Sequence, residues 1–466
     1  MGYANRRLRP ANGNFNSRVL KPAKKKSHVV VWVGVALLLL VAGGAALCLC
    51  LSPESEVQVY RKAAEKGDAE AMLKLGLCYK NGKGIEKNKI EAANWFLKSA
   101  KKGNVDAMLE MESCYQFGSG VRKDMREAAK WYWRAAEKGN AYAMHELGEL
   151  YHKGEGVEAD MNEAINWWKR ADAKGMLCAT VSLGDCYGTG DGVRRDMREA
   201  VKWWRKAAEK GMGSAQIHLA SCYYDGDGVE KDFVEAVKWW RAAAEGKFQW
   251  AEAMNGLGWC YYRGDGVDKD FDEAVKWFQK AADRGNVSAM TNLGLCYSCG
   301  NGVDKNFDEA VKWWRKAADH GDGKAMRNLG LCYLRGDGVE KDVDTGLGWY
   351  RRSAGSGVVD TMYELGIIYE SGEFVLKDRR EAIKWYREAA KGGHEGAKKR
   401  LTELLKQGQA FERDIWGKAM RAPGGSMQNN ESTQLFRNMG FRESTSRAMS
   451  EEFERHMRRR TGNAQW

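Results

Sequence analysis

Cysteine is the residue type in this 466-residue chain with the most capacity for metal binding, redox chemistry or nucleophilic attack, and its spacing decides among these roles. Equivalent positions in stacked helix pairs lie about 10 Å apart, which is beyond the reach of a disulfide. Seven of the eleven cysteines occupy one position of a repeated segment, directly before a tyrosine: Cys78, Cys114, Cys186, Cys222, Cys260, Cys296 and Cys332. We therefore interpret these thiols as small hydrophobic side chains of a core.

Two further cysteines and the histidines offer weaker signals of chemistry. Cys296 and Cys299 form a C-x-x-C pair, but no second pair completes a zinc or redox site, so we interpret them as packing residues. Cys178 lies at a variable position and is expected to be reachable by a thiol reagent. The seven histidines share no spacing, and no Ser or Cys nucleophile is placed beside a base. The sequence predicts no catalytic residue, no metal site, no cofactor and no enzyme activity.

Glycine-rich loops and tryptophans are the other patterns with a functional alternative. The loop Asp225–Gly228 is similar to a calcium loop, but Val229 stands where another oxygen ligand is needed. Fourteen of the nineteen tryptophans recur on predicted second helices, almost all in pairs. Their rings have the capacity to stack on sugars or bases. The regular placement instead favours wedges inside a core, with the more exposed member of each pair left as a candidate for sugar stacking.

These residues are positioned by a repeat that extends from Gly67 to Gly392. Equivalent glycines such as Gly67, Gly103 and Gly139 are 36 residues apart. The interval from Gly228 to Gly266 is 38, which places a two-residue insertion at residues 247–249. A fixed period of this length predicts a solenoid of stacked units.

Each unit is predicted to hold two antiparallel helices. In the unit that starts at Gly285, Ala289, Leu293 and Cys296 form one apolar helical face, and Asn286 is the predicted N-cap. Asn306 caps the second helix, and Glu309 three residues later completes a capping-box pattern. The same pattern recurs at Asp124/Glu127, Asp160/Glu163, Asp196/Glu199, Asp232/Glu235 and Asp270/Glu273. A single hairpin cannot cover its apolar side, so neighbouring units must stack.

The motif A-x-x-x-L-G-x-x-Y, G-x-G-V, D-x-x-E-A-x-x-W and A-A-x-x-G closely resembles the Sel-1-like repeat family, which is tetratricopeptide-like. The resemblance covers nine units, with a helix at residues 56–66 before them and a capping helix at residues 395–407 after them. It implies an all-α fold, a right-handed α/α superhelical solenoid of helix-turn-helix repeats, and a scaffold that holds partner proteins. Proteins similar to these also act in membrane-bound complexes, secretion and polysaccharide export.

The chain departs from the family pattern at a few positions. Glu112 and Ala220 stand where the pattern has glycine, and Phe374 replaces the second loop glycine. Gly346 and Gly348 are expected to weaken the second helix of the eighth unit.

The N-terminal region predicts a membrane anchor. Residues 1–28 carry eight Lys or Arg and no acid, and the uncharged residues 29–51 are long enough to cross a bilayer core of about 30 Å. The positive-inside rule places the N-terminus in the cytoplasm and the repeats outside it, in a periplasm or a lumen. The alternative is a cleaved signal peptide with Gly44 and Ala46 at the cut site. The unpaired cysteines are awkward in an oxidising compartment, which speaks against this topology unless they are buried.

The predicted domains follow from these features. They are a basic cytoplasmic leader (1–28), a transmembrane signal anchor (29–51), the repeat solenoid (54–408) and a mostly disordered basic tail (409–466). Because the positive-inside rule accounts for the Lys and Arg residues of the leader, we expect no nucleic-acid partner. We also expect no small-molecule substrate.

Positions that vary between repeats are the candidates for recognition, because packing fixes the rest. Two such positions, one turn apart on the first helices, are expected to line the concave surface. The candidate protein-binding residues are His145, Glu149, Cys178, Asp185, Trp259, Leu295, Arg327, Leu331 and Tyr363. The predicted function is a membrane-anchored protein-interaction scaffold; the alternative is a carbohydrate-associated module of cell-envelope polysaccharide handling that uses exposed aromatic rings.

Overall fold

The computed structural model describes residues 52–407 and residue 451, and this part of the chain is helical with no strand. The helices of the first four units and the helix before them are α1 (Pro53–Glu65), α2 (Ala69–Asn81), α3 (Lys89–Lys101), α4 (Val105–Phe117), α5 (Met125–Glu137), α6 (Ala141–Lys153), α7 (Met161–Ala173), α8 (Leu177–Thr189) and α9 (Met197–Ala208). Those of the last five units are α10 (Gly213–Asp225), α11 (Phe233–Glu245), α12 (Ala251–Arg263), α13 (Phe271–Asp283), α14 (Val287–Cys299), α15 (Phe307–Asp319), α16 (Gly323–Arg335), α17 (Val343–Gly355), α18 (Val359–Ser371) and α19 (Arg379–Lys391). Residues 395–407 form a further helix.

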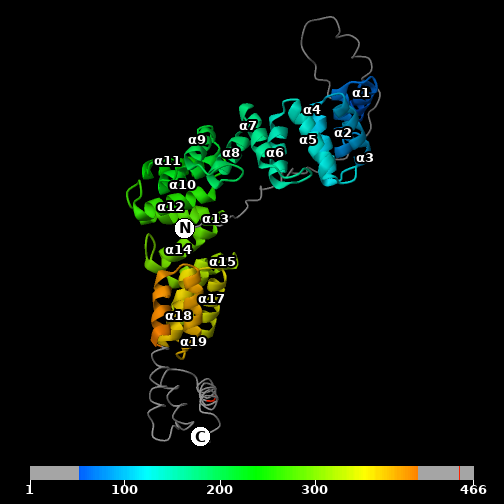
Figure 1. The fold of residues 1–466 in the computed structure, drawn as a ribbon. Coiled ribbons are helices and arrows are strands. Elements are labelled where there is room, and N and C mark those ends of the chain that lie inside the picture. Colours follow the sequence, from blue (N-terminus) through cyan, green and yellow to red (C-terminus); the bar gives the residue numbers. More distant parts are fainter. Residues whose placement is uncertain (1–51, 408–450, 452–466) are drawn as a thin grey trace, which may run out of the picture.

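The helices stack in chain order into a bent, elongated array with α1 at one end and α19 at the other (Figure 1). Each even-numbered helix, the first of its unit, packs against the odd-numbered helix that follows and also against the one before it. This arrangement confirms the predicted helical solenoid. The predicted anchor (29–51) and all of the tail (409–466) except residue 451 lie outside the described residues. Among the helices that the structure does describe, none is long and apolar enough to cross a membrane.

Short polar side chains begin the helices as predicted. The carboxylate of Asp196 accepts hydrogen bonds from the backbone N–H groups of Arg198 and Glu199 at the start of α9. The side-chain oxygen of Asn306 likewise accepts one from the backbone N–H of Glu309 at the start of α15. The capping-box prediction is wrong in its second half. Five of the six glutamates accept a hydrogen bond from a lysine three residues later, as Glu199 does from Lys202 at 2.7 Å, and the backbone N–H of the cap donates elsewhere, as Asp196 does to the Tyr187 carbonyl.

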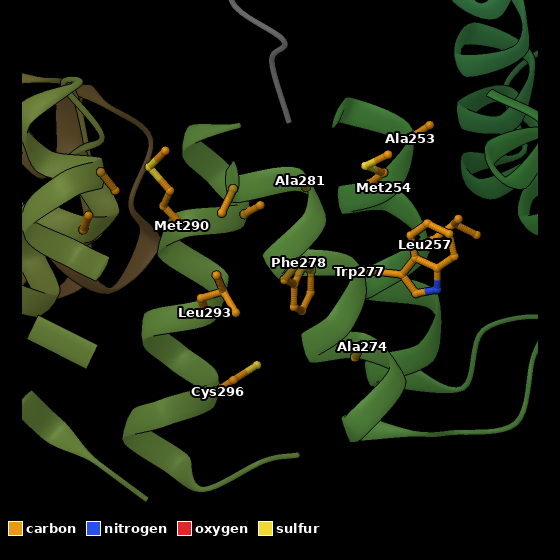
Figure 2. Close-up of a cluster of buried hydrophobic side chains, with 14 of the residues drawn as sticks. Ala253, Met254, Leu257, Ala274, Trp277, Phe278, Ala281, Met290, Leu293 and Cys296 are labelled. Carbon is orange, nitrogen blue, oxygen red and sulfur yellow. The ribbon is translucent and has the colours of Figure 1, made fainter. Parts of the chain in front are cut away.

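The recurrent core explains the Leu-Gly motif. In Figure 2, Phe278 of α13 and Leu293 of α14 point into the space between their helices. A Cβ added to Gly258 of α12 would lie 2.5 Å from Cδ1 of Phe278, so only glycine lets the ring come this close. Because the second aromatic residue of every pair is buried, the interpretation of these rings as core wedges is confirmed.

The first aromatic residue of most pairs is covered by a cation three positions later. The distances from the cation to the ring centroid are 3.9–5.3 Å for Lys98 over Trp95, Arg134 over Trp131, Arg170 over Trp167, Lys206 over Trp203, Lys280 over Trp277, Lys316 over Trp313 and Arg352 over Trp349. A sugar would therefore have to displace a cation from the face of the ring.

Two departures from the repeat are accommodated locally. The insertion at residues 247–249 forms a turn in which Gln249 has φ 48°, the one non-glycine residue of the described chain with positive φ. The helix α17 runs through Gly346 and Gly348 to Gly355, so the expected weakening does not interrupt it.

Candidate functional site

The first helices build a concave groove of about 1010 Å³ that extends over the fifth to ninth units. Its central residues are Asn255 and Trp259 of α12 and Thr291 and Asn292 of α14. Lys324, near the start of α16, lies at one border. The lining therefore combines one large aromatic ring with side-chain amides and hydroxyls, and with charged groups of both signs at Asp225, Asp322 and Lys324.

The two asparagines of this groove are fixed relative to each other. The Asn292 side-chain N–H donates to the side-chain oxygen of Asn255 at 2.9 Å, across the boundary between two units. Both side-chain amides can form further hydrogen bonds, because Asn255 retains its two N–H donors and Asn292 retains its oxygen and one N–H. The backbone carbonyl of Thr291 accepts the indole N–H of Trp314 at 3.1 Å, which ties α14 to the core behind the groove.

Trp259 is held in place from several sides and is half-buried. Its ring meets Phe278 edge-on, with centroids 5.8 Å apart, and meets Tyr262 in the same manner at 5.4 Å. The guanidinium of Arg263 lies 5.0 Å from the ring centroid. A ring fixed in this way loses little side-chain entropy when an apolar group packs against it.

Most of the other predicted residues in the C-terminal half are committed to neighbours. Arg327 forms a two-point ion pair with Glu364 of the next unit, with one bond of 2.8 Å from Nε to Oε2. Tyr363 stacks on His394 with ring centroids 4.1 Å apart. Leu295 and Leu331 are half-buried. Trp259 is the one residue of the predicted set that lines the groove.

The predicted charged residues of the N-terminal half bond to neighbouring side chains. Glu149 accepts a bond from Lys153 at 2.8 Å and lies 3.9 Å from His145. Asp185 accepts the indole N–H of Trp204 at 2.9 Å, and its pKa is raised, chiefly because the surrounding protein excludes water. His218 stacks on Trp204 and lies 3.7 Å from the Asp185 carboxylate.

Glu112 on α4 is the most unusual charged group of this half. Its side chain is 5% exposed, and Oε1 is buried without a hydrogen-bond partner among the described residues. Burial raises its pKa to about 7, while a hydrogen bond with Tyr132 on α5 opposes the shift and Glu146 and Glu110 add to it.

The cysteines divide into buried and exposed groups. The seven that precede a tyrosine are buried and free, as predicted, and burial raises the pKa of Cys296 to about 12. Cys178 is exposed, and so is Cys299, which corrects its interpretation as a packing residue. Among the residues that the structure describes, no three His, Cys, Asp or Glu side chains are grouped as a metal would require.

Several groove residues were missed by the sequence analysis. Asn292 and Lys324 lie next to the chosen variable positions, and His320 and Ser356 lie in the loops before α16 and α18. These positions also differ between repeats, so the variability signal was present at them. Their convergence depends on how units stack, which the pattern of one unit does not contain.

Comparisons with known proteins were made for the whole chain. The Sel1 repeat family matches nine stretches: 69–104, 106–140, 141–175, 179–212, 213–248, 251–286, 287–322, 323–358 and 359–394. The crystal structure of a Sel1 repeat protein from Oxalobacter formigenes is similar at 28% identity and a TM-score of 0.55, covering 72% of this chain and 99% of that one. A protective antigen of uropathogenic Escherichia coli strains with an SLR fold has 27% identity and a TM-score of 0.46, covering 80% and 98%. A search of curated proteins finds no match.

Proposed function

Because this chain belongs to the Sel1 repeat family, we propose that it is a membrane-anchored scaffold whose groove at Asn255, Trp259 and Asn292 binds a segment of a partner protein. Sel1 repeat proteins generally mediate protein–protein interactions and are generally non-enzymatic. The observation that carries the proposal is the groove itself, which places an immobilised aromatic ring beside side-chain amides with unused hydrogen-bonding capacity.

The groove chemistry suits an extended peptide. A peptide backbone presents both N–H and C=O groups, and the Asn255 and Asn292 amides are able to bond to either kind. Trp259 offers a face for an apolar side chain of the peptide, which is the type of contact that dominates binding energy at protein interfaces. The charged residues at the groove, Asp225, Asp322 and Lys324, are of both signs, so the lining does not require a partner of one charge.

The membrane anchor is a second part of the proposal and is supported by sequence. The basic residues 1–28 and the apolar residues 29–51 have the order of a signal anchor, which would hold the repeats outside the cytoplasm. Alkaline phosphatase fused to the C-terminus should be active and green fluorescent protein at the same site should be dark. The opposite pair of results would reverse the orientation.

Photocrosslinking tests the groove in the cell. Benzoylphenylalanine at Ser288, an exposed residue at the groove, should give a discrete protein adduct, while the same group at the exposed Lys312 on α15 should not. Trp259→Ala should remove the Ser288 adduct. Trp313→Ala is the matched control, because Trp313 is also half-buried but lies on α15 and is covered by Lys316. Equal adducts at Ser288 and Lys312, or equal loss of the Ser288 adduct in the two Trp→Ala variants, would reject the groove as the binding site for a partner.

The carbohydrate-associated alternative is less compatible with the ring environments. Cations cover the first tryptophans of most units, so these faces are not open to a sugar. Trp133, half exposed on α5, is the main exception. Glycan arrays probed with the full chain should stay blank, and binding that Trp133→Ala removes would favour the carbohydrate role.

A further inference from the structure

A second concave surface, of about 660 Å³, lies in the fourth unit where the loop after α8 leads into α9. Three arginines line it, Arg194, Arg195 and Arg198, together with Tyr187 and the capping residue Asp196. It shares no residue with the groove of α12 and α14, so it is a separate feature of the molecule.

The same loop carries the opposite charge in most other units, whereas the second unit shares two of the arginines as Arg122 and Arg126. The position of Arg194 is held by acids in six units: Glu86, Glu158, Glu230, Asp268, Asp304 and Glu340. The position of Arg198 is acidic in three: Asp272, Asp308 and Asp344. An acid in the first turn stabilises a helix through the helix dipole, and a cation there is unfavourable. The arginines of the fourth unit therefore do not serve helix formation.

The basic residue at the position of Arg195 also makes different contacts in other units. In the fifth, sixth and seventh units it is a lysine that lies over a phenylalanine ring two positions later, at 4.6–5.1 Å: Lys231 over Phe233, Lys269 over Phe271 and Lys305 over Phe307. In the fourth unit Met197 replaces the ring. Arg195 instead donates from Nε to the Gly188 carbonyl at 2.9 Å and lies 3.4 Å from Asp227. Its guanidinium is thereby held at the edge of the cavity.

Tyr187 contributes an unused hydroxyl. In five other units the equivalent tyrosine accepts a hydrogen bond from an arginine of the preceding helix, as Tyr223 does from Arg205 at 2.7 Å. The residue equivalent to Arg205 before Tyr187 is Lys169, and the structure shows no hydrogen bond to the Tyr187 hydroxyl. The side chains of Arg194 and Arg198 likewise form no ion pair or hydrogen bond with the described residues.

We propose that Arg194, Arg195, Arg198 and Tyr187 form a binding site for a phosphate group. Guanidinium groups recognise tetrahedral oxyanions through paired N–H donors, and several of them together favour a doubly charged anion. The first N–H groups of α9 are already bonded to Asp196, so the arginine side chains, not the helix end, bind the ligand. Asp196 and Asp227 offset two of the three positive charges, and the site keeps a positive balance. The phosphate belongs either to a free phosphomonoester or to a lipid headgroup.

Calorimetric titration of the full chain in a non-ionic detergent with inorganic phosphate tests the site. We expect saturable binding, and the double variant Arg194→Asp/Arg198→Asp should weaken it at least about tenfold. This variant places at each position an acid of the kind that other units already carry, so helicity by circular dichroism should be unchanged. Arg122→Asp/Arg126→Asp in the second unit makes the same change at the equivalent positions and is the matched control. Lys123 stands there in place of Arg195, so the third guanidinium that the Gly188 carbonyl holds in the fourth unit is missing, and this variant is expected to bind as the unaltered chain does.

Vesicle flotation identifies the source of the phosphate. Phosphatidylcholine vesicles that contain phosphatidic acid are compared with vesicles of phosphatidylcholine alone. Stronger binding to the former that the Arg194/Arg198 variant loses would assign the site to a lipid headgroup. Equal binding to both, together with binding of inorganic phosphate, would assign a soluble ligand. No saturable heat up to about 10 mM phosphate, or an equal loss of affinity in the Arg122/Arg126 control, would overturn the proposal. Neither result would affect the groove, since the two sites share no residue.

Discussion

On the first helices α6 and α8, the variable positions include charged side chains that bond to other side chains of the protein. On α12 and α14, the equivalent positions hold uncharged side chains, and these line a groove. Glu149 is bonded to Lys153, and Asp185 to Trp204. Asn255 and Asn292 bond to each other and keep most of their donors and acceptors unused. The two regions have the same backbone architecture and differ in what their variable positions do.

This difference shows that variation between repeats has two separate causes. A charged side chain that already has an internal partner would have to lose it to bind a ligand, which costs desolvation as well as the bond. An amide that has unused donors and acceptors need not break an internal bond to bind a ligand, and it carries no charge to desolvate. The variable positions of α6 and α8 therefore bond within the protein, whereas those of α12 and α14 leave side chains available for recognition.

The largest expected effect tests whether the two halves share one core. Leu147 of α6 and Leu293 of α14 are equivalent and almost fully buried, with 1% and 0% exposure. Replacing either by alanine should lower the free energy of unfolding by about 2–5 kcal/mol, because a buried cavity is created. Urea denaturation followed by circular dichroism measures both. A cost below about 1 kcal/mol at one site only would show that the halves pack differently.

A second prediction separates the halves by pH. The pKa of Glu112 is raised to about 7 from 4.5, so the folded chain holds a proton that the unfolded chain releases. Stability should be unaffected below pH 4.5, fall between pH 4.5 and 7, and be lower by about 3 kcal/mol above that range. Hydrogen exchange should show the loss at α4–α6 and not at α12–α14.

The control for this pH effect is Glu112→Gln, which keeps the size of the side chain but cannot ionise. The fall of about 3 kcal/mol should be absent from the stability profile of this variant. Tyr132 on α5, Tyr142 and Glu146 on α6 and Glu110 on α4 surround the carboxyl and stay in place. A slope that persists in the Gln variant would assign the effect to another group.

A third prediction concerns the bonds made by the variable side chains themselves. Asp185→Ala should cost about 1 kcal/mol, because the indole N–H of Trp204 loses its partner, and should leave the photocrosslinked adduct at Ser288 intact. Asn292→Ala should cost no more than about 1 kcal/mol in stability and yet reduce that adduct. If both variants changed the adduct equally, the assignment of recognition to one half would be wrong.

The sequence was informative wherever a residue recurs. The helices, the Asp and Asn caps, the aromatic wedges and the buried cysteines repeat with the period, because each unit must bury the same face. It was less informative for the variable positions. Tyr363 differs between repeats as Trp259 does, but His394 from the following residues stacks on it. Asn292 acts together with Asn255 from another unit, and no pattern inside one unit records that contact. Pairing and recognition both require variation, so variation alone does not separate them.

The smallest expected effect compares one exposed cysteine from each half. The protein around Cys178 on α8 and the nearby carboxylate of Glu146 raise the pKa of its thiol, so little thiolate is present near neutral pH. Glu146→Gln should therefore speed alkylation of Cys178 by about two- to threefold, and alkylation of Cys299 on α14 should keep its rate because Glu146 lies in another part of the array. Mass spectrometry of peptides after timed iodoacetamide treatment measures each site, with buried Cys296 expected to stay unmodified. An equal change at both exposed thiols would mean that the variant loosens the whole array, and the acidic surroundings of α8 would then not be what distinguishes the N-terminal half.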